Sequence, residues 1–141
     1  MDYGTILEQW AQVQPDKACL VEEEQVFSYG EMARKARVYR DSLKQLGIPR
    51  QTVLIIRPRP AAQLEAFLGA ELAGWVPVLG HPDLSKEAAD ELARVRQIGW
   101  IDDGTLRPGC LEAPVPAENL CMGVLSSGST GLPKLMFRTY G

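Results

Sequence analysis

Hydrophobic and polar positions follow two periods along this chain, one typical of helices and one typical of buried strands. The helical period is clearest after Ser28, where apolar residues spaced by three and four form one stripe: Met32, Ala36, Tyr39, Leu43 and Leu46. Residues 52–57 instead form a continuous run, TVLIIR, of the kind that is covered on both faces in a parallel sheet. The first pattern predicts an amphipathic helix closed by Gly47, and the second predicts a central strand.

Three hydroxyl residues mark the expected starts of helices. Thr5 and Ser28 each stand three residues before a glutamate, the spacing of a capping box, in which the hydroxyl accepts a backbone N–H of the first turn. Ser85 precedes a third periodic segment at residues 85–98, and residues 61–73 predict a fourth helix. The helix after Thr5 is expected to be buried through three residues: Ile6, Leu7 and Trp10.

Short apolar segments between these helices predict strands at residues 18–22, 26–27, 75–79, 100–102 and 120–126. Strands that alternate with helices indicate an α/β fold whose sheet is mainly parallel and flanked by helices. Residues 103–118 contain glycine, proline and polar residues without periodicity, so we predict a loop there.

Composition and charge narrow the class of protein. With 141 residues, 45% hydrophobic and 23% charged, the chain fits one globular domain or a large piece of one. The net charge is −3, yet residues 28–60 hold eight basic and two acidic side chains. Most of these basic residues lie on the polar face of the helix after Ser28, with only Tyr39 among them. We therefore expect a solvated face and no nucleic-acid binding.

The chain also lacks the features of secreted, membrane-spanning or metal-binding proteins. Its longest apolar run, residues 120–125, is too short to cross a bilayer, and its N-terminus has no basic region followed by an apolar stretch. Three cysteines without a CxxC pair and a single histidine, His81, argue against a disulfide framework and a zinc site. We expect a cytoplasmic protein with reduced thiols and no metal ligands in this chain.

The segment that points to chemistry is residues 125–134, LSSGSTGLPK, where a buried strand leads into small residues and then a lysine. Glycines allow close approach of backbone amides to a ligand, hydroxyls add donors, and a lysine adds a positive charge for phosphate oxygens. The expected ligand is a polyphosphate. The candidate binding residues are Ser126, Ser127, Gly128, Ser129, Thr130, Gly131 and Lys134.

Other phosphate and nucleophile motifs do not fit this spacing. The P-loop pattern needs a glycine before Lys134 and a hydroxyl after it, where Pro133 and Leu135 stand. A nucleophile elbow around Ser129 needs a glycine where Ser127 stands, and the dinucleotide fingerprint is absent. A flexible Gly/Ser linker is the plain alternative, although linkers seldom follow a buried strand directly.

The run SSGSTGLPK resembles the phosphate-loop signature of the adenylate-forming superfamily, which holds acyl-CoA synthetases, peptide-synthetase adenylation domains and luciferases. Two more segments resemble earlier motifs of that family in the same order, FSYGEM at residues 27–32 and LAGWVPVL at residues 72–79. The resemblance implies that residues 1–141 are an incomplete N-terminal subdomain of an AMP-binding domain, part of the large N-terminal domain, with the phosphate loop at residues 125–134. Leu135 departs from the glycine that commonly follows the loop lysine, and the interval from Pro77 to Ser126 is short.

The resemblance further implies a ligase that joins a carboxylic acid to ATP, with Mg, and passes the acyl group to a thiol. The acceptor would be coenzyme A or the phosphopantetheine of an acyl carrier protein. Residues 133–140, PKLMFRTY, resemble PKLIPRTH of aryl-acid ligases, which favours an aromatic acid, although Phe137 and Tyr140 break the match. The adenine, ribose and magnesium motifs and the catalytic lysine of the family have no counterpart here, so no catalytic residue is assigned.

Two alternatives from other classes stay open. One is a non-catalytic, truncated adenylation module that binds a nucleotide or a partner, and the other is a plain phosphate-binding α/β protein. We expect the chain alone to be catalytically inactive, and to associate with the remainder of its own polypeptide or with another copy.

Overall fold

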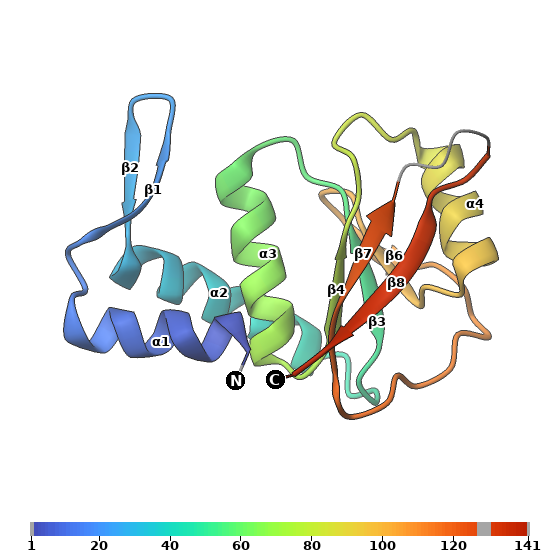
Figure 1. Cartoon of the computed structure of the whole chain (residues 1–141), viewed down its shortest axis with the longest axis horizontal. Helices are drawn as coiled ribbons and strands as arrows, with labels where there is room; N and C mark the ends of the chain where they lie inside the picture. Colours follow the sequence, from blue (N-terminus) through green and yellow to red (C-terminus); the bar gives the residue numbers. More distant parts are fainter. Residues whose placement is uncertain (1, 127–130, 141) are drawn as a thin grey trace.

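The computed structural model describes residues 2–126 and 131–140, and its centre is a six-stranded sheet (Figure 1). The strand order is β6-β5-β3-β4-β7-β8, and the four central strands run parallel while β6 and β8 are antiparallel to their neighbours. The six strands are β3 (Thr52–Ile55), β4 (Val76–Leu79), β5 (Trp100–Asp102), β6 (Leu106–Pro108), β7 (Leu120–Ser126) and β8 (Lys134–Thr139). The predicted α/β fold with a mainly parallel sheet is confirmed.

Helices cover both faces of this sheet (Figure 1). The four helices are α1 (Tyr3–Val13), α2 (Tyr29–Lys44), α3 (Pro60–Leu72) and α4 (Lys86–Arg96). Alternate residues of β3 belong to two separate hydrophobic clusters: Val53 and Ile55 pack with α1, α2 and α3, whereas Leu54 packs with α4. Side chains alternate between the faces of a strand, so the sheet forms the middle layer of three.

A separate hairpin projects from the helical layer (Figure 1). Its strands are β1 (Ala18–Glu22) and β2 (Gln25–Ser28), paired antiparallel. Glu23 in the tight turn between them has φ 54°, in the left-handed region. The hairpin confirms the two short strands predicted at residues 18–22 and 26–27, and β2 extends one residue further at each end.

Two of the three predicted helix starts are confirmed. Ser28 accepts a hydrogen bond from the Glu31 amide (3.1 Å), and Ser85 accepts one from the Ala88 amide (3.1 Å). Thr5, however, is not a cap, because the first helix begins earlier and its N-cap is Asp2. The Asp2 carboxylate accepts the Thr5 amide at 2.7 Å, since an aspartate caps as well as a hydroxyl does.

The predicted burial of α1 is only partly correct. Leu7 is buried as expected, but Ile6 and Trp10 are 36% and 41% exposed. The Trp10 ring stacks on Tyr29 with centroids 5.7 Å apart, and the Lys17 ammonium lies 5.4 Å from its centroid. The indole is thus half covered by the start of α2 instead of lying in the core.

The stripe of α2 is buried from Met32 to Leu43, but Leu46 is 37% exposed. The helix ends at Lys44 with Gln45 as its C-cap. Gly47, predicted as the C-cap, lies two residues further on with φ +65°. The prediction placed the end of the helix too late, because the left-handed glycine belongs to the turn after it.

Both antiparallel edge strands were missed from the sequence. Residues 103–118 are not all loop, because Leu106–Pro108 forms β6 against β5. The segment after the glycine- and serine-rich run forms β8, which pairs along β7 from Leu120 to Ser126. One edge of β7 is therefore covered by β8 and the other by β4. None of the helices among the described residues is long and apolar enough to cross a membrane.

Candidate functional site

The candidate phosphate loop connects β7 to β8 at the carboxyl end of the parallel strands. Ser126 ends β7 and Lys134 begins β8, and the two residues are paired in the antiparallel register. Gly131 has φ +92°, a conformation that L side chains rarely adopt. The structure thus places the two ends of the predicted loop side by side, with a left-handed glycine before the return strand.

Four of the seven predicted binding residues lie outside the residues that the structure describes: Ser127, Gly128, Ser129 and Thr130. The other three, Ser126, Gly131 and Lys134, are described, and they belong to one hairpin. The structure therefore describes β7 and β8, the two paired strands that hold the ends of the loop.

The two strands that hold the loop, β7 and β8, are tightly packed. A Cβ placed on Gly123, in the middle of β7, would lie 2.7 Å from Val78 Cγ2 and 2.8 Å from Leu135 Cδ1. Leu132 and Leu135, on either side of Lys134, pack against the hydrophobic cluster between the sheet and α4. Small size at Gly123 therefore lets β4 and the side chain of Leu135 approach β7 closely.

An arginine that was not predicted from the sequence contacts residues 132–133, which we call the return limb of the loop because they lead back into β8. Arg96, the last residue of α4, donates from Nε to the Pro133 carbonyl at 2.8 Å and from Nη2 to the Leu132 carbonyl at 3.3 Å. No local pattern could reveal this contact, because Arg96 lies 36 and 37 residues from its partners along the chain.

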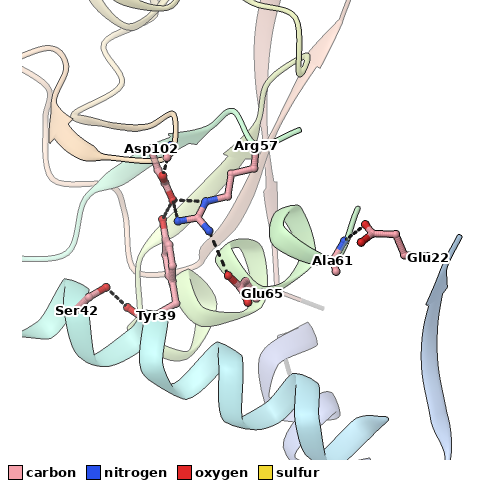
Figure 2. Close-up of polar contacts among 8 residues, drawn as sticks. Glu22, Tyr39, Ser42, Arg57, Ala61, Glu65 and Asp102 are labelled. Carbon is pink, nitrogen blue, oxygen red and sulfur yellow. Dashed lines mark hydrogen bonds and ion pairs between the residues drawn. The ribbon is translucent and has the colours of Figure 1, made fainter. Parts of the chain in front are cut away.

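Away from the candidate loop, a cluster of hydrogen-bonded polar side chains lies at the carboxyl ends of β3 and β5 (Figure 2). Asp102 is 1% exposed, and its Oδ2 accepts from the Tyr39 hydroxyl at 2.8 Å and from Arg57 Nε at 3.0 Å. Arg57 Nη1 also donates to Glu65 at 3.1 Å, and its guanidinium lies 5.5 Å from the centre of the Tyr39 ring. Burial, followed by the neighbouring Asp102 carboxylate, raises the pKa of Tyr39.

This cluster, Tyr39, Arg57, Glu65 and Asp102, has the properties of a structural junction. The remaining Asp102 oxygen accepts the Gly104 amide at 3.0 Å, so both carboxylate oxygens are satisfied and the charge is balanced by Arg57. A buried ion pair with complete hydrogen bonding holds strand ends and helices in one arrangement. We therefore assign the cluster to joining β3 and β5 to α2 and α3, and not to chemistry.

A cavity of about 460 Å³ lies between the start of α1, α3 and the β7–β8 hairpin. Glu71 lines it and is 2% exposed, with Oε1 accepting the Gly4 amide at 3.2 Å. Its other oxygen, Oε2, has no hydrogen-bond partner among residues 2–126 and 131–140. Burial raises the pKa of Glu71 to about 7, and the nearby Asp2 carboxylate acts in the same direction.

With this geometry established, comparison with known proteins decides the family. The sequence pattern of AMP-binding enzymes matches residues 7–99, which is more than half of the chain. The chain belongs to the AMP-binding enzyme family. The predicted resemblance to adenylate-forming enzymes is thereby confirmed. The matched residues end before the β7–β8 hairpin, so the family assignment does not depend on the candidate phosphate loop.

Two similar proteins are much longer than this chain. Pyochelin synthetase PchF of Pseudomonas aeruginosa (strain UCBPP-PA14) is 29% identical over 143 aligned residues, which cover 85% of this chain and 8% of the synthetase. The Klebsiella oxytoca NpsA N-terminal subdomain in complex with 3-hydroxybenzoyl-AMSN superposes with a TM-score of 0.76 at 19% identity. That match covers 98% of this chain and 41% of the NpsA chain.

A third similar structure is the anthranilate CoA ligase AuaEII in complex with anthranoyl-AMP. Its TM-score is 0.72 at 19% identity, covering 99% of this chain and 35% of AuaEII. These likenesses establish that the fold is that of part of an AMP-binding enzyme. The chain spans less than a tenth of the curated relative and less than half of either solved neighbour.

Metal ligands do not gather in the part of the chain that the structure describes. Within residues 2–126 and 131–140, no group of three or more His, Cys, Asp or Glu side chains could hold a metal ion. His81 is exposed in the turn after β4, where its Nδ1 accepts the Asp83 amide at 3.1 Å. The described cysteines, Cys19, Cys110 and Cys121, are free thiols. We assign none of these residues a role in catalysis.

Proposed function

We propose that this chain supplies the phosphate-binding loop of an AMP-forming ligase that activates a carboxylic acid. The observation that carries the proposal is the β7–β8 hairpin, which holds a loop of hydroxyls and glycines between the paired residues Ser126 and Lys134. The loop residues proposed to bind the β- and γ-phosphates of ATP are Ser126, Ser127, Gly128, Ser129, Thr130, Gly131 and Lys134.

The chemistry explains why donors would be gathered on these phosphates. In acyl-adenylate formation the carboxylate of the acid attacks the α-phosphorus of ATP and pyrophosphate leaves. Backbone amides, hydroxyls and the Lys134 ammonium would stabilise the negative charge that grows on the leaving group. Removal of one such donor typically costs about 2.7–4 kcal/mol of transition-state stabilisation.

The donor set of the loop fits a polyphosphate, since residues 126–131 are all hydroxyls or glycines and carry no acidic side chain. ATP would act with Mg²⁺, but we assign no magnesium ligand to this chain, because its described residues bring no set of metal ligands together. We likewise assign no residue that grips adenine or ribose.

For the acid, we propose an aromatic carboxylic acid. Residues 133–140 resemble the corresponding run of aryl-acid ligases, and NpsA and AuaEII were solved with 3-hydroxybenzoyl and anthranoyl groups. For the acceptor, we propose a thiol, either coenzyme A, as the name of AuaEII suggests, or the phosphopantetheine of a carrier protein, as the similarity to a synthetase suggests.

A second candidate is a non-catalytic adenylation module that binds a nucleotide or a partner chain. The observation that favours it is that the family pattern matches residues 7–99 and does not extend to the candidate phosphate loop. Residues 1–141 would then form an incomplete N-terminal subdomain, with the loop at residues 125–134. In either case we expect the 141-residue chain alone to catalyse no adenylation.

The test is ATP–pyrophosphate exchange by the polypeptide that contains this chain, over a panel of benzoates, fatty acids and amino acids. We expect exchange that depends on a benzoate, and a fall of at least 100-fold in the double variant T130A/K134A. The matched control is K86A, since Lys86 is an exposed lysine on α4. Absence of acid-dependent exchange would favour the non-catalytic module. Unchanged exchange in T130A/K134A would contradict the loop assignment.

A further inference from the structure

The return limb of the candidate phosphate loop is held from outside the hairpin. Leu132 and Pro133 turn the chain back toward Lys134, and their two carbonyls both accept hydrogen bonds from Arg96 (2.8 Å to Pro133 and 3.3 Å to Leu132). The guanidinium is a planar fork with fixed donor directions, so it fixes the relative orientation of the two carbonyls. The peptide unit that leads into Lys134 is thereby held.

Arg96 is itself held firmly. It is the last residue of α4, and Gln97 closes the helix in the left-handed conformation, with φ 57° and its amide bonded to the Ala93 carbonyl. Ala93 on one side and Ile98 on the other are fully buried. These residues belong to the same hydrophobic cluster that Leu132 packs against. The Arg96 donor and its carbonyl acceptors therefore lie on segments that pack in the same hydrophobic cluster.

Arg96 has no carboxylate partner within residues 2–126 and 131–140, where every ion pair involves other cations. Arg107 provides the contrast, because it pairs with both Asp90 and Asp103. A half-buried guanidinium without a carboxylate partner among the described residues, bonded to the limb that leads into Lys134, raises the positive potential at the loop.

From these contacts we infer that Arg96 is a positioning residue for polyphosphate binding. It fixes the Leu132–Pro133 limb so that Gly131 and Lys134 are presented to the phosphates, and it does not itself touch the ligand. The inference rests on the proposed function of the loop. It adds a determinant that lies on α4, outside the glycine- and serine-rich run.

The experiment is an NMR titration of the 141-residue chain with inorganic tripolyphosphate, following the amides of Gly131, Leu132 and Lys134. Wild type is compared with R96A, R96K and K134A. The matched control is R94A, because Arg94 lies one half-turn away, is exposed, and forms its ion pair with Glu91 on its own helix, at 4.0 Å. Hydrogen exchange at residues 131–135 is measured in the same samples, and thermal unfolding checks that each variant is folded.

We expect R96A to bind tripolyphosphate about tenfold more weakly, a loss of the size that one charge-assisted hydrogen bond contributes. Its amides at residues 131–135 should exchange faster, whereas R94A should match wild type. R96K keeps the charge but replaces the rigid planar fork by an ammonium on a flexible stem, so it should hold the two carbonyls less rigidly and also bind more weakly than wild type.

Two results would overturn the inference, and they differ from each other. If K134A loses binding while R96A or R96K binds like wild type, the loop assignment survives and the role of Arg96 is wrong. If wild type, K134A and R96A show the same response to tripolyphosphate, or none, the proposed function of the loop fails and the inference fails with it.

Discussion

The buried carboxyl group of Glu71 should make the stability of this fold depend on pH. Glu71 is 2% exposed, one of its oxygens accepts the Gly4 amide, and the other has no partner among residues 2–126 and 131–140. Burial, reinforced by the Asp2 carboxylate, raises the pKa of Glu71 from 4.5 to about 7. The folded state therefore holds this proton more tightly than the unfolded state does.

The sign and size of the effect follow from proton linkage. A raised folded-state pKa stabilises the fold fully below pH 4.5, and this stabilisation is lost as the pH rises through 7. A difference of about two and a half pKa units corresponds to about 3 kcal/mol in the free energy of unfolding. The substitution Glu71→Gln removes the titration and keeps an oxygen for the Gly4 amide. Relative to wild type, the variant should gain about 3 kcal/mol between pH 4.5 and pH 8.

The assay is urea unfolding followed by tryptophan fluorescence at several pH values between 4.5 and 8, since Trp75 is buried in the core. Comparison of E71Q with wild type across pH cancels any constant cost of the amide and the titration of all other groups. The control is E91Q, because Glu91 is an exposed residue on α4. Parallel stability curves for wild type and E71Q would refute the assignment of a raised pKa to Glu71.

Two further predictions concern packing and the buried ion pair. Asp102→Asn should destabilise the fold by about 3–5 kcal/mol, because Arg57 and the Tyr39 hydroxyl lose a charged acceptor. The control Asp103→Asn should cost under about 1 kcal/mol, because its ion pair with Arg107 is more exposed. Equal midpoints of urea unfolding for the two variants would contradict the structural role of Asp102. Gly69→Ala should destabilise by about 1–3 kcal/mol despite the better helix propensity of alanine, since its Cβ would lie 2.6 Å from the Ala36 carbonyl oxygen. A thermal midpoint at or above that of wild type would show that α2 and α3 can separate without cost.

The parts of the fold that could be predicted are those that local sequence determines. The run at residues 52–57 predicted a buried strand, and β3 occupies Thr52–Ile55 of it. The Ser28 and Ser85 caps act through bonds to residues three positions away. The strands at 100–102 and 120–126 were predicted with the bounds that the structure has. In these segments propensity and pattern agree with the tertiary structure.

The parts that were missed depend on partners distant in sequence. β8 carries the pattern KLMFRT, with Met136 and Phe137 half exposed, and it becomes a strand because β7 lies beside it. Trp10 looks like a core residue, but Tyr29 and Lys17 cover it at the surface. For the candidate site, the run at residues 126–134 was evident from composition. Its contact with Arg96 was not, because that contact exists only once α4 has packed against the sheet.

The central claim, that the loop binds the phosphates of ATP, is tested most directly by chemical labelling of Lys134. An acyl-phosphate derivative of ATP transfers its acyl group to a lysine amine held beside the phosphates, and peptide mass spectrometry locates the modified residue. The chain offers four other lysines as internal controls: Lys17, Lys35, Lys44 and Lys86. Our account predicts preferential labelling of Lys134 that excess ATP or tripolyphosphate blocks and adenosine does not. Labelling of Lys134 no greater than that of the other lysines, or labelling that excess ATP leaves unchanged, would contradict it.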